Sequence, residues 1–94
     1  MTMQQRLRAK LEAALAPVRL EVINESELHA GHRSSPGTGE SHFRIIVVSP
    51  AFDGVGRLER HRKINQLVAD ELRQPGGVHA LAVHAYAPGE PERH

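Results

Sequence analysis

The chain has no cysteine, no tryptophan, two phenylalanines and one tyrosine among its 94 residues. Without cysteine there can be no disulfide framework, no zinc knuckle and no thiol nucleophile, and this absence is typical of a reducing compartment. The shortage of aromatic residues argues against RNA-binding modules that stack bases on exposed rings. It also predicts that the core is aliphatic.

Neither sign of charge dominates, because 12 Lys and Arg residues and 11 Asp and Glu residues leave a formal net charge of +1. Bulk charge therefore does not direct the chain to nucleic acid, and any basic patch must be local. No apolar run reaches the about 20 residues that a membrane-spanning helix needs. Segment 1–16 is better explained as a folded amphipathic helix than as a targeting peptide, because it contains Glu12 and regular apolar spacing. We expect a cytoplasmic protein that does not bind a membrane.

Sequence motifs of the common enzyme classes are also missing. The chain has no Walker loop, dinucleotide-binding glycine pattern, zinc-protease helix motif or nucleophile elbow. The segment Gly37-Thr38-Gly39 is too short for a phosphate-binding loop and lacks the lysine that should follow it. No serine and acid accompany a histidine in a recognisable catalytic order. We therefore predict that the protein is not an enzyme.

Apolar spacing predicts the element order helix, strand, strand, helix, strand. Helical spacing stops at Pro17, and two short alternating segments follow it. A second helix begins at Gly56 or Arg57, and a glycine-rich turn ends it before the last strand. The predicted elements cover residues 3–15, 18–22, 43–47, 57–72 and 78–87. This order predicts an α+β fold, a small sandwich with helices on one face of a three-stranded mixed sheet.

The chain has the length of one domain, which we place at 1–94 with order from about residue 3 to residue 87. Residues 27–41 form a long polar loop that Pro36 and several glycines keep out of regular structure. Loops of this length in small domains are usually functional or disordered. Residues 88–94 are expected to form a frayed tail.

Seven histidines are spread over this small chain, and imidazole is both a metal ligand and a proton switch near neutral pH. By strand parity His79 shares its side with Leu81 and Val83, so it lies where the buried face reaches the end of the sheet. It is either a metal ligand or a partly buried histidine that hydrogen-bonds to backbone. His84 has the opposite parity and is expected to be an exposed strand residue.

The loop histidines are less informative by themselves. His29 and His32 are three residues apart, a spacing that can bind a metal but is equally expected of a solvated loop. His42 has the opposite parity to Phe43, so it is expected to order the exit of the loop rather than to bind metal.

A basic run opens the second predicted helix. Residues 60–63 are Arg, His, Arg and Lys, and Arg57 precedes them by one turn. Cations at the positive end of a helix cost a few tenths of a kcal/mol each, roughly, unless an anion faces them. The run is either a site for phosphate or for a partner's carboxylates, or a solvated patch that Glu59 and Asp70 partly offset.

Several of these segments occur together in a known family, in its order and with its spacing, from about Leu7 to Pro88. They are Asn24-Glu25-Ser26, His29-Ala30-Gly31-His32, Gly39-Glu40-Ser41-His42-Phe43, Val48-Ser49, Phe52-Asp53-Gly54, Arg60-His61-Arg62 and Val78-His79-Ala80-Leu81. The chain thereby resembles the BolA-like family. The resemblance implies a class II KH-like α+β fold, in agreement with the element order.

The resemblance also implies two roles. BolA-like proteins bind monothiol glutaredoxins, often around a bridging [2Fe-2S] cluster, in iron–sulfur trafficking and iron regulation. Some bacterial members are described as stress-responsive, DNA-binding transcriptional regulators that affect cell shape and biofilm. Either DNA phosphates or the glutaredoxin with its glutathione would meet the basic start of the second helix, at Arg57, Arg60, His61, Arg62 and Lys63. For the DNA role, Gly54-Val55-Gly56 is one residue short of the KH Gly-x-x-Gly loop.

In the cluster-bridged complexes, the resemblance makes His79 an expected iron ligand. The second ligand comes from the loop between the first two strands, and with no cysteine there His29 is the first choice and His32 the second. The glutaredoxin cysteine and a bound glutathione would supply the other ligands. The isolated protein is expected to be a monomer without a cofactor.

Overall fold

A computed structural model describes residues 2–26, 42–74 and 77–93. Its elements confirm the predicted order, with the last part of the long helix separated as an element of its own. They are α1 (Met3–Leu15), β1 (Arg19–Asn24), β2 (His42–Val48), the short 3-10 helix η2 (Pro50–Phe52), α2 (Arg57–Leu67), α3 (Ala69–Arg73) and β3 (Ala80–Tyr86).

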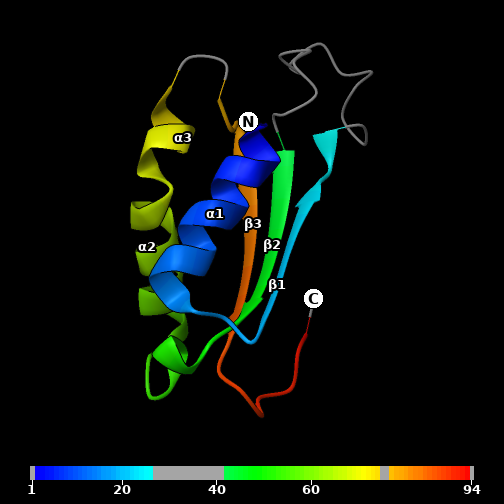
Figure 1. Ribbon diagram of the computed structural model, residues 1–94. Coiled ribbons are helices and arrows are strands. Elements are labelled where there is room, and N and C mark those ends of the chain that lie inside the picture. Colours follow the sequence, from blue (N-terminus) through cyan, green and yellow to red (C-terminus); the bar gives the residue numbers. More distant parts are fainter. Residues whose placement is uncertain (1, 27–41, 75–76, 94) are drawn as a thin grey trace.

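The sheet has the strand order β1-β2-β3. Strand β1 pairs with β2 antiparallel, and β2 pairs with β3 parallel. A parallel neighbour needs a crossover connection, and α2 and α3 supply it. All three helices lie on one face of the sheet (Figure 1). The predicted α+β sandwich with a mixed three-stranded sheet is therefore confirmed.

The core lies between the helices and the sheet, and it is aliphatic as predicted apart from two phenylalanines. Helix α1 buries one residue per turn, and Thr2 begins it through a capping box with Gln5. In β2 every second residue faces the helices, so Phe43, Ile45 and Val47 are buried in the core. The buried cluster consists of Met3, Leu7, Leu11, Leu15, Val22, Phe43, Ile45, Val47, Phe52, Ile64, Val68, Val78 and Ala87.

The second predicted helix is broken at Val68. This residue has φ −110° and ψ 21°, outside the helical region, although its side chain is fully buried. The single helix predicted up to residue 72 is therefore wrong: α2 ends at Leu67 and α3 begins at Ala69, with the β-branched Val68 packed into the core between them. Helix α3 then places Glu71 against α1.

Glu71 is a charged residue with no exposed surface, which sequence periodicity did not indicate. Its carboxylate accepts hydrogen bonds from Arg6 at 2.7 Å and from Lys10 at 2.8 Å, so it ties α3 to α1. Burial raises the pKa of Glu71, but the hydrogen bond and charge of Lys10 and the charge of Arg6 outweigh it, so the pKa lies below its usual range. The carboxylate is therefore held in its ionised form.

None of the helices in the described residues lies on the outer face of the sheet, yet Ile46 and Val48 there are only 4% and 8% exposed. Arg44 lies in the middle of this face and donates to Glu25 at 2.8 Å. It also lies 2.6 Å from Nε2 of His84. Because arginine can only donate, Nε2 of His84 is the acceptor in this contact. The expectation that His84 is exposed is wrong, since the sheet face and Arg44 partly bury it.

The two ends of the fold also differ from expectation. Val18, predicted on the apolar side of the first strand, precedes β1 and is 67% exposed. The tail expected from Pro88 makes contacts: Glu92 forms an ion pair with Arg19, and the backbone N–H of Arg93 donates to the Tyr86 hydroxyl at 2.8 Å. The segment thus returns beside β1 (Figure 1).

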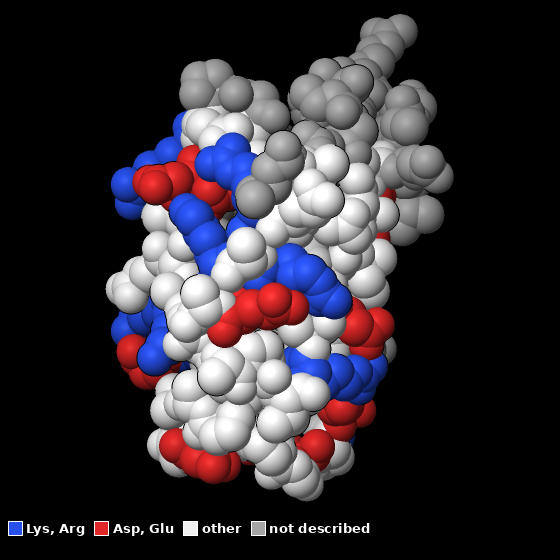
Figure 2. All heavy atoms as spheres, in the orientation of Figure 1, with Lys and Arg blue, Asp and Glu red and all other residues white. Residues whose placement is uncertain are grey.

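Basic and acidic side chains are interspersed over the surface. On the face shown in Figure 2, Lys and Arg side chains lie beside Asp and Glu side chains rather than forming a patch of one sign. This distribution fits the net charge of +1. Any anion site must therefore be a local arrangement of a few side chains.

Candidate functional site

His79 lies at the end of the sheet, one residue before β3, and its side chain is exposed. Parity placed it on the buried face with Leu81, but Val78 occupies the buried position at this end and is 5% exposed. The chain enters β3 from a turn, so strand alternation does not extend back to His79. The alternative of a partly buried histidine is therefore wrong for the described structure.

The turn before His79 is tightly packed. The backbone N–H of Val78 donates to the carbonyl of Glu71 at 3.0 Å, and that of Gly77 donates to the carbonyl of Gln74 at 2.9 Å. A Cβ at Gly77 would lie 2.3 Å from the Glu71 carbonyl oxygen, so no larger residue fits without a backbone shift. This turn fixes where β3 begins and where His79 lies.

His42, the first residue of β2, lies next to His79. Their ring centres are 5.4 Å apart and their planes are inclined by 54°. The backbone of His42 donates to the Ser26 hydroxyl at 3.1 Å and accepts from Glu25 at 2.8 Å, as a residue that orders the loop exit should. Parity did not predict the contact with His79.

A clue to this contact lay in the topology. In the parallel pair, His42 stands opposite Ala80, so the residue before Ala80 must lie near His42. The order of elements in the sequence did not show that β2 and β3 pair in parallel.

His29 and His32, the expected loop ligands, lie outside the described residues. Within residues 2–26, 42–74 and 77–93, no group of three or more His, Asp or Glu side chains could hold a metal ion.

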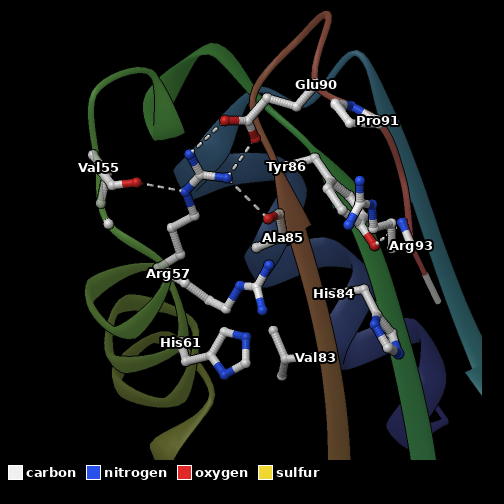
Figure 3. A pocket seen from close by; sticks show the side chains of 12 residues that line it. Val55, Arg57, His61, Val83, His84, Ala85, Tyr86, Glu90, Pro91 and Arg93 are labelled. Atoms are coloured by element: carbon white, nitrogen blue, oxygen red, sulfur yellow. Dashed lines mark hydrogen bonds and ion pairs between the residues drawn. The ribbon is translucent and has the colours of Figure 1, made fainter.

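A second site lies towards the C-terminal end of β3. An open groove of about 810 Å³ runs between the start of α2, β3 and the segment after it. Arg57 and His61 enter it from α2, and Arg93 lies across β3 from them, beside Tyr86 (Figure 3). Gly56, the N-cap residue of α2, also lines the groove, and it has no side chain to cap the first helical turn.

Arg60 also faces this groove, but its guanidinium is used within the fold. It donates to the carbonyls of Val55 at 2.7 Å and of Phe52 and Ala85 at 3.1 Å, and it holds both carboxylate oxygens of Glu90 at 2.6 and 2.9 Å. The hydrogen bond from Arg60 lowers the pKa of Glu90 to about 2. Arg60 thus joins η2, α2, β3 and the C-terminal segment.

The basic run therefore does not act as one patch. Arg62 forms an ion pair with Glu59 at 2.7 Å, with both side chains 61% exposed. Together with Lys63 it lines a separate shallow depression. Of the five basic residues predicted as a binding surface, Arg57 and His61 are the two that face the groove and are not bound to a carboxylate in the described structure. Sequence reasoning missed Arg93, because it lies in the expected tail.

The family model for BolA-like proteins matches residues 11–90. The chain belongs to the BolA-like family. It is 52% identical to an uncharacterised protein encoded 5′ of cobS in Sinorhizobium sp., over 99% of both chains. It is 44% identical to the "DNA-binding transcriptional regulator BolA" of Escherichia coli, over 92% of this chain and 76% of that protein.

Solved structures agree with the family assignment. The BolA domain of SufE1 from Arabidopsis thaliana is 44% identical and superposes with a TM-score of 0.84, over 97% of this chain and 98% of that one. Several curated relatives are longer proteins: the chain spans 57% of the length of BolA-like protein 1 from Pongo abelii. Within the described ranges, no helix combines the length and the hydropathy needed to cross a membrane.

Proposed function

We propose that this chain is a non-enzymatic adaptor that binds a monothiol glutaredoxin and provides histidine ligands to a [2Fe-2S] cluster shared with it. The proposal is supported by the family assignment and, above all, by the position of His79. This imidazole is exposed at the end of the sheet, where a second chain can approach it. A cytoplasmic location and a monomeric state of the isolated chain remain predictions.

The chemistry of the available donors fits such a cluster. Imidazole is a ligand for iron, and the chain offers no thiolate, so the glutaredoxin cysteine and glutathione would supply the sulfur ligands. His79 is the first proposed ligand, and His29, or in its place His32, is the second. A bound cluster would supply a redox centre whose potential is raised by histidine ligation. Because imidazole must be neutral to bind iron, acid should weaken the complex.

Mixing the protein with cluster-loaded monothiol glutaredoxin is expected to change the visible absorption and circular dichroism of the glutaredoxin. We expect His79→Ala to abolish that change, because the exposed ligand is lost while the strand register remains. His84→Ala is the matched control, since His84 lies on the same strand and bonds to Arg44 instead. An unchanged spectrum with His79→Ala would remove His79 as a ligand.

A second candidate function is a DNA-binding regulator. It is favoured by the groove at the start of α2, where Arg57 and Arg93 offer cationic side chains beside His61, and by the likeness to the Escherichia coli DNA-binding transcriptional regulator BolA. So few phosphate contacts give weak and salt-sensitive binding. Arg60 is not part of this surface, because Glu90 and three carbonyls occupy its guanidinium.

For this candidate, the double substitution Arg57→Ala and Arg93→Ala should weaken retention on duplex DNA and reduce the slope of log affinity against log salt by about two. The physical reason is the loss of two phosphate contacts and of the counterions they release. Retention on a duplex-DNA resin, measured at a series of salt concentrations, gives both the strength of binding and its dependence on salt. Arg8→Ala with Arg73→Ala removes the same charge elsewhere on the surface. Equal losses of DNA retention in the two double variants would show that net charge alone causes the effect, and would exclude the groove as the DNA-binding site.

A further inference from the structure

The contact between His42 and His79 has a geometry that suits a metal ion. A divalent ion bound at about 2.0–2.1 Å from one nitrogen of each of two imidazoles, in tetrahedral coordination, brings the ring centres to about 5 Å from each other. The observed separation is 5.4 Å. The planes are inclined by 54°, so the rings are not stacked face to face on each other.

We infer that His42 and His79 bind one divalent transition-metal ion between them in the isolated chain. Two imidazoles suit Zn²⁺, Ni²⁺ and Cu²⁺ better than Mg²⁺ or Ca²⁺, which prefer oxygen ligands. With two protein ligands, the remaining coordination positions are open to water or to donors of a second molecule. Exposure of His79 leaves room for them.

Both rings are carried by fixed backbone, which favours binding because little has to be ordered when the ion arrives. His42 belongs to the ladder with β3, in which it faces Ala80. His79 is held from the other side by the hydrogen bond from Val78 to the Glu71 carbonyl. The two imidazoles are thus brought together by the parallel pairing of β2 and β3 and by the turn that precedes β3.

The charged neighbours are compatible with a cation. Arg44, two residues after His42 on the same strand face, is the nearest basic residue on that strand, and its guanidinium is bound to Glu25 at 2.8 Å. The same ion pair occupies the Glu25 carboxylate. The proposed site has two nitrogen ligands and is thus smaller than a group of three or more His, Asp or Glu side chains, of which the described part of the chain has none.

This site goes beyond the proposed adaptor function, because it requires neither glutaredoxin nor iron. The two proposals share His79 and make a joint prediction: an ion on the histidine pair should compete with formation of the cluster complex. The metal site can nevertheless be present when the cluster proposal fails, and absent when it holds.

The test is titration of the purified protein with Zn²⁺ alone, followed by calorimetry and by the ring resonances of the histidines in NMR spectra. We expect the His42 and His79 rings to shift together in the unsubstituted protein, a result that depends on no variant folding correctly. His42→Ala and His79→Ala should each lower zinc affinity at least as much as the about 10–100-fold that loss of an outer-shell partner costs. His84→Ala should keep the affinity.

Two results would overturn the metal site. One is a zinc response of other histidines while the His42 and His79 rings stay unshifted. The other is full zinc affinity in His42→Ala together with its loss in a His29→Ala, His32→Ala double variant. Mixing each variant with cluster-loaded glutaredoxin in parallel separates failure of this site from failure of the adaptor proposal, because His42→Ala removes the zinc site and leaves the proposed cluster ligands in place.

Discussion

Arg60→Ala is expected to lower the free energy of unfolding by about 2–4 kcal/mol, because it leaves several buried acceptors without a charged donor. The Arg60 side chain is 11% exposed and donates to three backbone carbonyls, in η2, in the segment before α2 and in β3. It also lies over the ring of Phe52, 5.8 Å from the ring centre. Urea unfolding followed by far-UV circular dichroism measures the loss.

Arg62→Ala is the matched control for Arg60→Ala. Arg62 lies on the same helix two residues later, but its single ion pair with Glu59 is exposed and should be worth less than about 1 kcal/mol. Arg60→Lys should recover little of the stability, since an ammonium group cannot make the forked contacts of a guanidinium. Equal stability of the Arg60→Ala and Arg62→Ala proteins would contradict the structural role of Arg60.

The hydrogen bonds between Arg60 and Glu90 should also make the stability of the fold depend on pH. The pKa of Glu90 is lowered to about 2, first of all by the hydrogen bond from Arg60. A carboxylate whose folded-state pKa is lowered stabilises the fold above its usual pKa of 4.5, and this contribution is lost as the pH falls towards 2. Stability of the Arg60→Ala protein should therefore decrease less over that range than stability of the unsubstituted protein.

The second large effect is expected when both cationic partners of Glu71 are removed. Arg6→Met with Lys10→Met leaves an unpaired carboxylate with no exposed surface and should cost about 3–5 kcal/mol of unfolding free energy. Adding Glu71→Met should restore most of the loss, because a buried ion pair can be replaced by apolar side chains of similar size. Arg73→Met with Lys63→Met removes the same charge from exposed positions and should change stability little.

The double variant should also reverse the pH dependence that Glu71 contributes. In the unsubstituted protein its pKa is lowered, so its contribution is present above 4.5 and is lost as the pH falls. Without Arg6 and Lys10, burial outweighs the backbone hydrogen bond that remains and raises the pKa of Glu71 above its unfolded value. Stability of the double variant should then decrease as the pH rises through the raised pKa. Urea unfolding at acidic and neutral pH distinguishes the two slopes, and parallel slopes would contradict this account.

Arg60 and Glu71 affect the functional sites indirectly, because they fix the backbone that positions the site residues. The backbone carbonyl of Glu71 anchors Val78, the residue before His79. Arg60 fixes the wall of the groove that Arg57 and His61 enter. Variants of Arg60 or Glu71 can therefore change binding indirectly, and binding experiments should substitute Arg57 or His79 instead.

Short-range patterns explain why so much of the architecture could be predicted. Leu7, Leu11 and Leu15 repeat at helical spacing, and Phe43 alternates with Ile45 and Val47. Both periods arise from local backbone geometry, so they appear in the sequence regardless of the rest of the fold. They failed at Val68, where packing into the core broke a continuous helical pattern.

Charged and imidazole side chains behaved differently because their partners are distant in the sequence. Arg60 and Glu90 are 30 residues apart, and Arg6 and Glu71 are 65 residues apart. A solvated basic residue and a buried one look the same in a sequence, since both keep a charge that needs either water or a partner. For Arg60 the sequence offered a solvated patch or a site for an outside anion, whereas the structure places Glu90 of the same chain on its guanidinium.

The amino-acid sequence by itself determined the order of elements, the α+β class and the family. Only the tertiary structure decided that Arg60 is a structural residue, that the C-terminal segment is tied to the sheet and that His42 lies against His79. The reason is physical: periodicity records which side of an element is apolar, whereas a charge or a ligand acquires its role from whichever atoms the folded chain brings within a few ångströms of it.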